Sequence, residues 1–262
     1  MRATGPRRTV NEAVSEDTLL GGRVRLRQPA EGYRVAIDPV LLAAAVPARP
    51  GEHVLEIGAG TGAAALCLAS RIEGCIVTGL ERDRDLAGFC RENVEANGFE
   101  RTVDVMVGDL RAPPARLGPA SFDHAMANPP WHSETAGPPP RNRQRARAHV
   151  EQGADLMHWV RFAATMLRRG GTLTTILTAE RLDEHLAAYT ASGIGETAVV
   201  PLWSKNDGRP AHRVILRGRK DIRGPISLLP GFVLHVSNGS YSPEIEQILR
   251  HSRALDFTWR RR

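Results

Sequence analysis

The chain has 262 residues, which is enough for one domain with a sizeable hydrophobic core, and it carries a formal net charge of +6. Its three cysteines are dispersed, which predicts buried free thiols and argues against a disulfide framework or a cysteine-rich metal site. The first 20 residues lack the apolar stretch of a secretory signal, and the longest apolar run, residues 40–46, is too short to span a membrane. We therefore expect a cytoplasmic protein that binds no metal.

The N-terminal part of the chain predicts a tail, a hairpin and a short helix. Residues 1–17 are polar and contain several arginines, as is typical of a flexible basic tail. Residues 18–28 alternate around Gly21 and Gly22, which favours a β-hairpin. Asp38 and Pro39 predict the start of a helix over residues 40–46, because aspartate suits the N-cap and proline suits the first helical position.

From residue 53 onward, strands and helices are expected to alternate. Short apolar runs predict the strands, and runs of good helix formers between them predict the helices. The order favours an α/β fold with a doubly wound, seven-stranded, mostly parallel sheet whose last strand is antiparallel. The expected strands cover residues 53–57, 75–80, 103–107, 122–127, 171–178, 196–202 and 212–217, and the expected helices cover residues 63–71, 84–97, 152–168 and 179–191.

A glycine-rich turn follows the first of these strands, with glycines at Gly58, Gly60 and Gly62. Glycines let the backbone approach a ligand closely, and the helix that follows the turn presents free N–H groups. Glu81 ends the next strand about 20 residues later, where an acid can accept hydrogen bonds from both ribose hydroxyls of an adenosine. Nicotinamide sites and S-adenosylmethionine sites share this combination.

Two details favour S-adenosylmethionine over a nicotinamide cofactor. The glycines follow the spacing G-x-G-x-G, whereas the dinucleotide motif is G-x-G-x-x-G. Glu56 lies two residues before the first glycine, where a carboxylate would help to fix a ligand ammonium group. Asp109, which follows the third strand, could accept a hydrogen bond from an adenine amino group.

The fourth strand is followed by Asn128, Pro129, Pro130 and Trp131, a pattern that predicts a clamp for a planar, conjugated amino group. The Asn128 oxygen and the Pro129 carbonyl can each accept one amino hydrogen, while the indole of Trp131 covers the face of the group. The prolines stiffen this segment because each fixes its own φ and restricts the residue before it. A proline-rich loop exit with a tryptophan packed on the core is the alternative interpretation.

Together these motifs resemble those of the class I S-adenosylmethionine-dependent methyltransferases. With Gly32-Tyr33-Arg34 and residues 234–244, the chain is similar to the bacterial tRNA(Val) adenine N6-methyltransferase family, from about residue 18 to residue 249. The resemblance implies S-adenosylmethionine as the cofactor and adenine N6 in tRNA as the acceptor. Trp131 departs from the tyrosine or phenylalanine that is commoner at its position. We expect one methyltransferase domain over residues 18–250, between the basic N-terminal tail and a basic C-terminal tail over residues 251–262.

Basic residues after the clamp motif suggest an RNA contact. No acid occurs between residues 135 and 150, and guanidinium groups in this segment could bind phosphates. A solvated arginine-rich loop without a binding role explains the same composition. The candidate substrate residues are Tyr33, at the lip of the pocket, and Arg141, Arg143, Arg145 and Arg147.

Other acceptors and other classes of protein stay open at this stage. The clamp also fits guanine N2 in ribosomal RNA and the side-chain amide of glutamine in a protein. A catalytically silent RNA-binding module on the same fold is the alternative outside the transferases. The sequence does not predict an oligomeric state.

Overall fold

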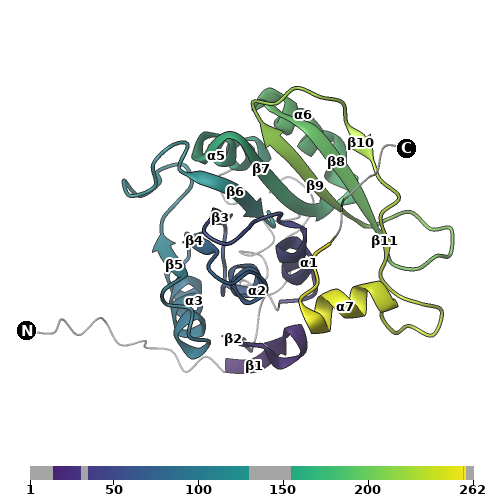
Figure 1. Ribbon diagram of the computed structural model, residues 1–262, viewed down its shortest axis with the longest axis horizontal. Helices are drawn as coiled ribbons and strands as arrows, with labels where there is room; N and C mark the ends of the chain where they lie inside the picture. Colours follow the sequence, from purple (N-terminus) through teal and green to yellow (C-terminus); the bar gives the residue numbers. More distant parts are fainter. Residues whose placement is uncertain (1–13, 31–34, 130–154, 256, 258–262) are drawn as a thin grey trace, which may run out of the picture.

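The computed structural model describes residues 14–30, 35–129, 155–255 and 257. A mixed β-sheet runs through the middle of this part, in the strand order β10-β8-β9-β7-β6-β3-β4-β5, with β11 also paired to β8 (Figure 1). The main strands are β3 (His53–Ile57), β4 (Ile76–Glu81), β5 (Val103–Val107), β6 (Phe122–Ala127), β7 (Leu167–Thr178), β8 (Ile194–Trp203) and β9 (Arg213–Lys220).

The strand directions confirm the predicted α/β sheet. Strands β3, β4, β5, β6 and β7 run parallel to one another, and β9 lies antiparallel between β7 and β8. The structure adds two short strands at the edge beside β8, which are β10 (Ser227–Leu228) and β11 (Phe232–Val233). A strand of two residues is too short to show alternation in a sequence, so no pattern predicted these two.

Helices cover both faces of the sheet (Figure 1). One hydrophobic core lies between the sheet and α1, α2, α3 and α7, and the second lies between the sheet and α5 and α6. Among the described residues, no helix has the length and apolar character needed to cross a membrane. The helices are α1 (Asp38–Ala45), α2 (Ala63–Arg71), α3 (Arg84–Ala96), α5 (Leu156–Met166), α6 (Leu182–Ala191) and α7 (Pro243–His251), with short 3-10 turns η1 (Leu20–Gly22) and η2 (Ala179–Arg181).

The predicted N-terminal hairpin is present but begins earlier than expected. Strand β1 (Val14–Leu19) pairs antiparallel with β2 (Val24–Pro29), and Val14 is already in register with Pro29. The expected tail over residues 1–17 is therefore wrong for residues 14–17, while residues 1–13 lie outside the described residues. β1 shows little burial along its length, so its sequence has no apolar signal that separates it from a tail.

Helix α1 does not begin as the sequence predicts. Its N-cap is Ile37, so the prediction of Asp38 as the N-cap is wrong by one residue. Asp38 is buried, and its Oδ2 accepts a hydrogen bond from Nε of Arg213 at 3.1 Å. Burial raises the pKa of the Asp38 carboxyl, and the neighbouring Arg213 guanidinium opposes this shift. The carboxylate thus ties α1 to the start of β9 and makes no cap hydrogen bond.

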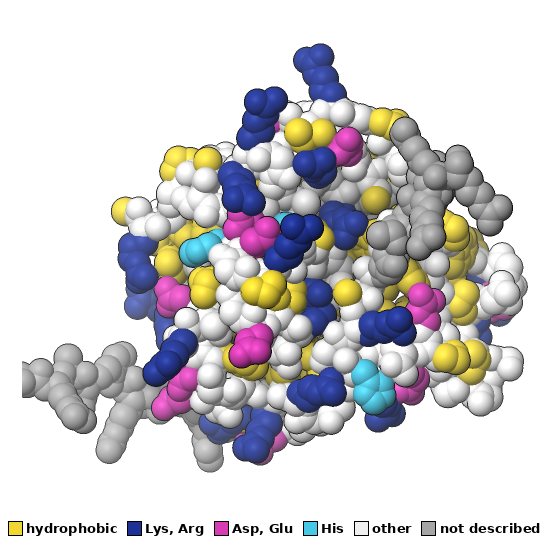
Figure 2. All heavy atoms as spheres, in the orientation of Figure 1, with side chains coloured by type: hydrophobic (Ala, Val, Ile, Leu, Met, Phe, Trp, Pro, Cys, Tyr) yellow, Lys and Arg dark blue, Asp and Glu magenta, His cyan; other side chains and the backbone are white. Residues whose placement is uncertain are grey.

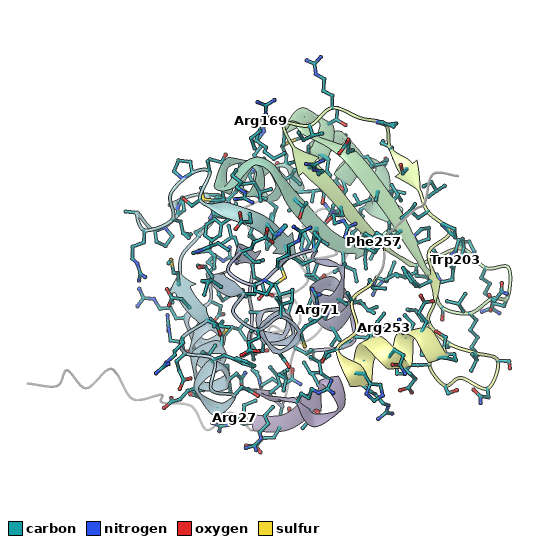
Figure 3. All side chains as sticks on the ribbon, in the orientation of Figure 1. Arg27, Arg71, Arg169, Trp203, Arg253 and Phe257 are labelled. Carbon is teal, nitrogen blue, oxygen red and sulfur yellow. The ribbon has the colours of Figure 1, made fainter. Side chains whose placement is uncertain are left out.

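The expected basic tail over residues 251–262 is also wrong in its first part. Leu255 is buried, and its N–H donates to the carbonyl of Ala44 in α1 at 2.9 Å. Phe257, labelled in Figure 3, is buried beneath the Arg217 guanidinium, whose carbon lies 4.1 Å from the ring centroid. These two apolar residues anchor the end of the described chain, although basic residues surround them in the sequence.

Candidate active site

Four sequence motifs meet at one edge of the sheet. Ile57 pairs with Leu80 of β4 on one side and with Ala127 of β6 on the other, and Glu81 pairs with Val107 of β5. Because these strands are parallel and in register, the segments that follow them lie together at their carboxyl ends. Ligands of open α/β sheets bind at this edge.

The glycine-rich turn has backbone angles that only glycine adopts readily. Gly58, Gly60 and Gly62 have φ values of 72°, 56° and 87°. A Cβ at Gly58 would lie 2.7 Å from Cη2 of Trp159, and a Cβ at Gly62 would collide with Sγ of Cys90. A Cβ at Gly60 would meet no atom within 4 Å. Gly58 and Gly62 therefore pack the turn against two helices, whereas Gly60 faces open space at the edge of the sheet.

Glu81 holds the glycine-rich turn through a backbone hydrogen bond. Its side chain is only 9% exposed, its Oε2 accepts from the N–H of Gly60 at 2.8 Å, and its Oε1 accepts from the N–H of Asp83 at 2.8 Å. Burial raises the pKa of this carboxyl, and hydrogen bonds from the backbone N–H groups of Asp83, Gly60 and Arg82 oppose the shift. A carboxylate offers about four acceptor positions, so Glu81 can still accept from a hydroxyl group that lies beside Gly60.

Glu56 is a buried acid of β3 whose side chain reaches the first turn of α2. Its side chain is 5% exposed, and its Oε2 accepts from the N–H of Ala65 at 2.9 Å. Burial raises its pKa to about 8, and the nearby Glu81 carboxyl adds to the increase. Among the residues that the structure describes, no basic side chain pairs with Glu56. A cationic group placed next to it would favour the charged form of this carboxyl.

Asp109 lies at the same edge but is engaged with a residue of its own loop. Its carboxylate accepts hydrogen bonds from Arg111, through the backbone N–H at 2.9 Å, Nε at 3.1 Å and Nη2 at 2.7 Å. These interactions hold the pKa of Asp109 below its ordinary value. The adenine contact of Asp109 stays a prediction, and any further donor would have to share the carboxylate oxygens with Arg111.

Asn128 and Pro129 follow β6 directly, and the structure places them beside the glycine turn. Asn128 is half-buried and Pro129 is buried. Their position follows from the pairing of Ile57 with Ala127, which brings the chain after β3 next to the chain after β6. The other predicted site residues lie outside the described residues: Tyr33, Pro130, Trp131, Arg141, Arg143, Arg145 and Arg147.

Trp159 packs against the glycine turn of the candidate site, a contact that the sequence did not predict. It is half-buried near the start of α5, and its ring lies against Gly58. The N-cap of this helix is Asp155, which accepts from the N–H of His158 at 2.9 Å. Helical periodicity places Trp159 in a helix but does not reveal that its ring meets the glycine turn. The only signal was an aromatic residue close to the N-terminus of the helix that follows the clamp.

The raised pKa of Glu56 predicts a pH-dependent contribution to stability. The folded protein holds a proton on Glu56 up to a pH of about 8, whereas the unfolded chain releases it near the ordinary value of 4.5. Between these pH values the native state binds the extra proton, so the free energy of unfolding should fall as the pH rises. In urea titrations across this range, Glu56→Gln should show a smaller fall than the wild type. Glu100→Gln, at an exposed position, is the control. If the free energy of unfolding falls equally with pH in the wild type and in Glu56→Gln, the prediction is contradicted.

Comparisons with known proteins identify a family of methyltransferases. Residues 34–188, more than half of the chain, match the family model of the methyltransferase small domain. The tRNA1(Val) (adenine(37)-N6)-methyltransferase of Aeromonas salmonicida is 31% identical over 226 residues, which cover 82% of this chain and 88% of that relative. A protein of the same name from Porphyromonas gingivalis is 30% identical over 237 residues, 85% of this chain and 89% of the relative.

Solved structures share the fold. The predicted O-methyltransferase Atu636 from Agrobacterium tumefaciens aligns with a TM-score of 0.69 at 24% identity, covering 84% of this chain and 98% of that one. P. horikoshii TYW2, solved in complex with MeSAdo, aligns with a TM-score of 0.54 at 15% identity, covering 80% of this chain and 72% of that one. The chain belongs to the methyltransferase small domain family and is an S-adenosylmethionine-dependent methyltransferase with a Rossmann-like fold.

Proposed function

We propose that this chain transfers the methyl group of S-adenosylmethionine to N6 of an adenine in tRNA. The observation that carries the proposal is the placement of Asn128 and Pro129 beside the glycine turn, through the pairing of Ile57 with Ala127. An acceptor pair for an amino group thus lies next to the turn that would hold the methyl donor. The relatives from A. salmonicida and P. gingivalis, which match more than four fifths of this chain, are both named as tRNA adenine N6-methyltransferases.

The residues at the carboxyl ends of these parallel strands fit the methyl donor. The space above Gly60 leaves room for a ligand against the backbone, and Glu81 beside it retains acceptor sites for the ribose hydroxyls. Glu56 is a buried acid that no described cation neutralises, which suits the ammonium group of the donor. Asp109 would accept from the adenine amino group. S-adenosylmethionine supplies an electrophilic methyl group on a sulfonium.

The clamp prepares the acceptor amine. The lone pair of an adenine N6 is delocalised into the ring, which makes the amine a poor nucleophile. Oδ1 of Asn128 and the carbonyl oxygen of Pro129 would each accept one of its two hydrogens, in a geometry that directs the lone pair toward the donor. The new N–C bond forms as the S–C bond breaks, and the methylated amine then loses a proton to water. Trp131 would stack on the flipped-out base.

Contacts with the rest of the RNA are assigned to residues beyond the clamp. Figure 2 shows a face on which basic and acidic side chains are interspersed, without a single large basic patch. The segment with Arg141, Arg143, Arg145 and Arg147 is our candidate for phosphate contacts because of its basic composition, and Tyr33 is our candidate for the lip of the pocket. A tRNA substrate would also place the enzyme in the cytoplasm.

The function can be tested by methylation of total cellular RNA. The purified protein is incubated with labelled S-adenosylmethionine and RNA, and the nucleosides are then separated. We expect label as N6-methyladenosine in the tRNA fraction. Label as N2-methylguanosine in ribosomal RNA, or in a glutamine side chain when cellular protein is offered, would overturn the proposed acceptor. Binding of RNA without any transfer would indicate a catalytically silent RNA-binding module.

Asn128→Ala tests the clamp. Loss of an oriented acceptor that acts in the transition state should reduce kcat by about 100-fold to 1000-fold, by analogy with other preorganised polar groups. The affinity for S-adenosylmethionine, measured by calorimetry, should change little. Glu81→Gln is the matched comparison, because it should weaken donor binding itself. If Asn128→Ala weakens donor binding as much as it reduces turnover, the assigned role is wrong.

A variant with Arg141, Arg143, Arg145 and Arg147 all changed to Ala tests the RNA contact. Each lost phosphate contact should flatten the dependence of log affinity on log salt concentration by about one unit of slope. The measurement is equilibrium binding of tRNA over a series of salt concentrations. Arg169→Ala is the control, since Arg169 lies near the start of β7, at the opposite edge of the sheet (Figure 3). An unchanged slope in the fourfold variant would remove this segment from the interface.

A further inference from the structure

We propose that Asn93 couples the N-terminal hairpin to the glycine-rich turn, so that the hairpin contributes to the affinity for the methyl donor. Asn93 would thus act as a positioning residue, through the turn and without touching the donor. The inference rests on the proposed role of residues 58–62 as the donor-binding turn. Its basis is a side-chain amide that joins three parts of the chain.

The amide of Asn93 is fully committed to backbone partners. Asn93 lies in α3 and is 0% exposed. Its Nδ2 donates to the carbonyl of Arg27 in β2 at 2.9 Å and to the carbonyl of Thr61 in the glycine turn at 2.9 Å. Its Oδ1 accepts from the N–H of Arg27 at 2.7 Å. Both amide hydrogens are used, so the side chain cannot turn without losing hydrogen bonds to both neighbours.

A second asparagine makes the same contact with the hairpin but does not reach the turn. Oδ1 of Asn97 accepts from the N–H of Arg25 at 2.8 Å, and its Nδ2 donates to the carbonyl of Arg25 at 2.7 Å. Residues four apart lie on one face of a helix, so α3 presents both amides to the edge of β2. The two amides satisfy backbone N–H and carbonyl groups of β2 as a neighbouring strand would. Strand β2 lies below α3 in Figure 1, and Figure 3 labels Arg27. The other hydrogen bond of Asn97 goes to the Asn93 carbonyl.

The turn needs support from outside because of its composition. Its glycines have wide conformational freedom, so holding them in one arrangement costs entropy. Helix α3 supplies two adjacent restraints, since Cys90 packs against Gly62 and Asn93 holds the carbonyl of Thr61. A turn that is already ordered before binding gives a higher ligand affinity, because less freedom is lost on binding. Asn93 would provide this order only while β2 holds its amide in place.

Asn93→Ala and Asn97→Ala form a matched pair of variants. Each releases one N–H and one carbonyl of β2, but Asn93→Ala removes a fully buried side chain and also releases the Thr61 carbonyl, so it should lose more stability in urea titrations. Only Asn93→Ala also frees the turn, and it should raise the Kd for S-adenosylmethionine about tenfold, within the usual range of coupling between sites. Asn97→Ala should leave this Kd within about twofold of the wild type, below the same range. Equal changes of Kd in the two variants, or no change in either, would overturn the coupling.

Amide hydrogen exchange tests the same coupling in the wild-type protein, and it decides the matter if Asn93→Ala does not fold. Because coupling is reciprocal, donor binding should slow exchange at the Arg27 amide, which Asn93 holds, more than at the Arg25 amide, which Asn97 holds. Equal protection of the two amides, measured by NMR with and without S-adenosylmethionine, would indicate a general stabilisation and contradict the inference. A wild-type protein that binds no donor would instead refute the proposed function.

Discussion

The in-register pairing of β3 with β4 and β6 is the constraint on which the site depends. Ile57 is opposite Leu80 on one side and Ala127 on the other, so three segments far apart in sequence emerge side by side. Side chains alternate between the faces of a strand, and a slip of one residue would move every side chain to the opposite face of the sheet. Both faces of the sheet are covered by helices, which leaves the carboxyl ends as the place where polar groups of these strands can converge.

Much of this arrangement could be predicted because its signals are local. The apolar runs of the strands, the glycines at Gly58, Gly60 and Gly62 and the acid at Glu81 each follow from a few neighbouring residues, and the structure brings Gly60 and Glu81 into direct contact. The wrong prediction of Asp38 as an N-cap has a non-local cause. The partner of Asp38 is Arg213, 175 positions away, and a pairing at that distance leaves no mark in a local pattern.

Asn93 shows the same limit of local sequence patterns, although its place in a helix gives a partial signal. Asn93 is a poor helix former inside α3, and Asn97 is the C-cap residue of the same helix. An asparagine at a helix C-terminus has a local explanation, but an asparagine inside an amphipathic helix indicates a hydrogen bond to another part of the fold. The pattern could have predicted a polar contact at this face of α3. It could not have named β2 or Thr61 as the partners, since both come from elsewhere in the chain.

The docking of the chain end onto α1 has a consequence for synthesis of the protein. Leu255 and Phe257 complete the apolar surroundings of a helix made more than two hundred residues earlier. A nascent chain on the ribosome cannot close this part of its core until Leu255 and Phe257 have been synthesised and have left the exit tunnel. Products that end before Leu255 would expose the uncovered surface of α1 and become substrates for chaperones and proteases. Quality control can therefore recognise the absence of these two residues through the apolar surface that they cover.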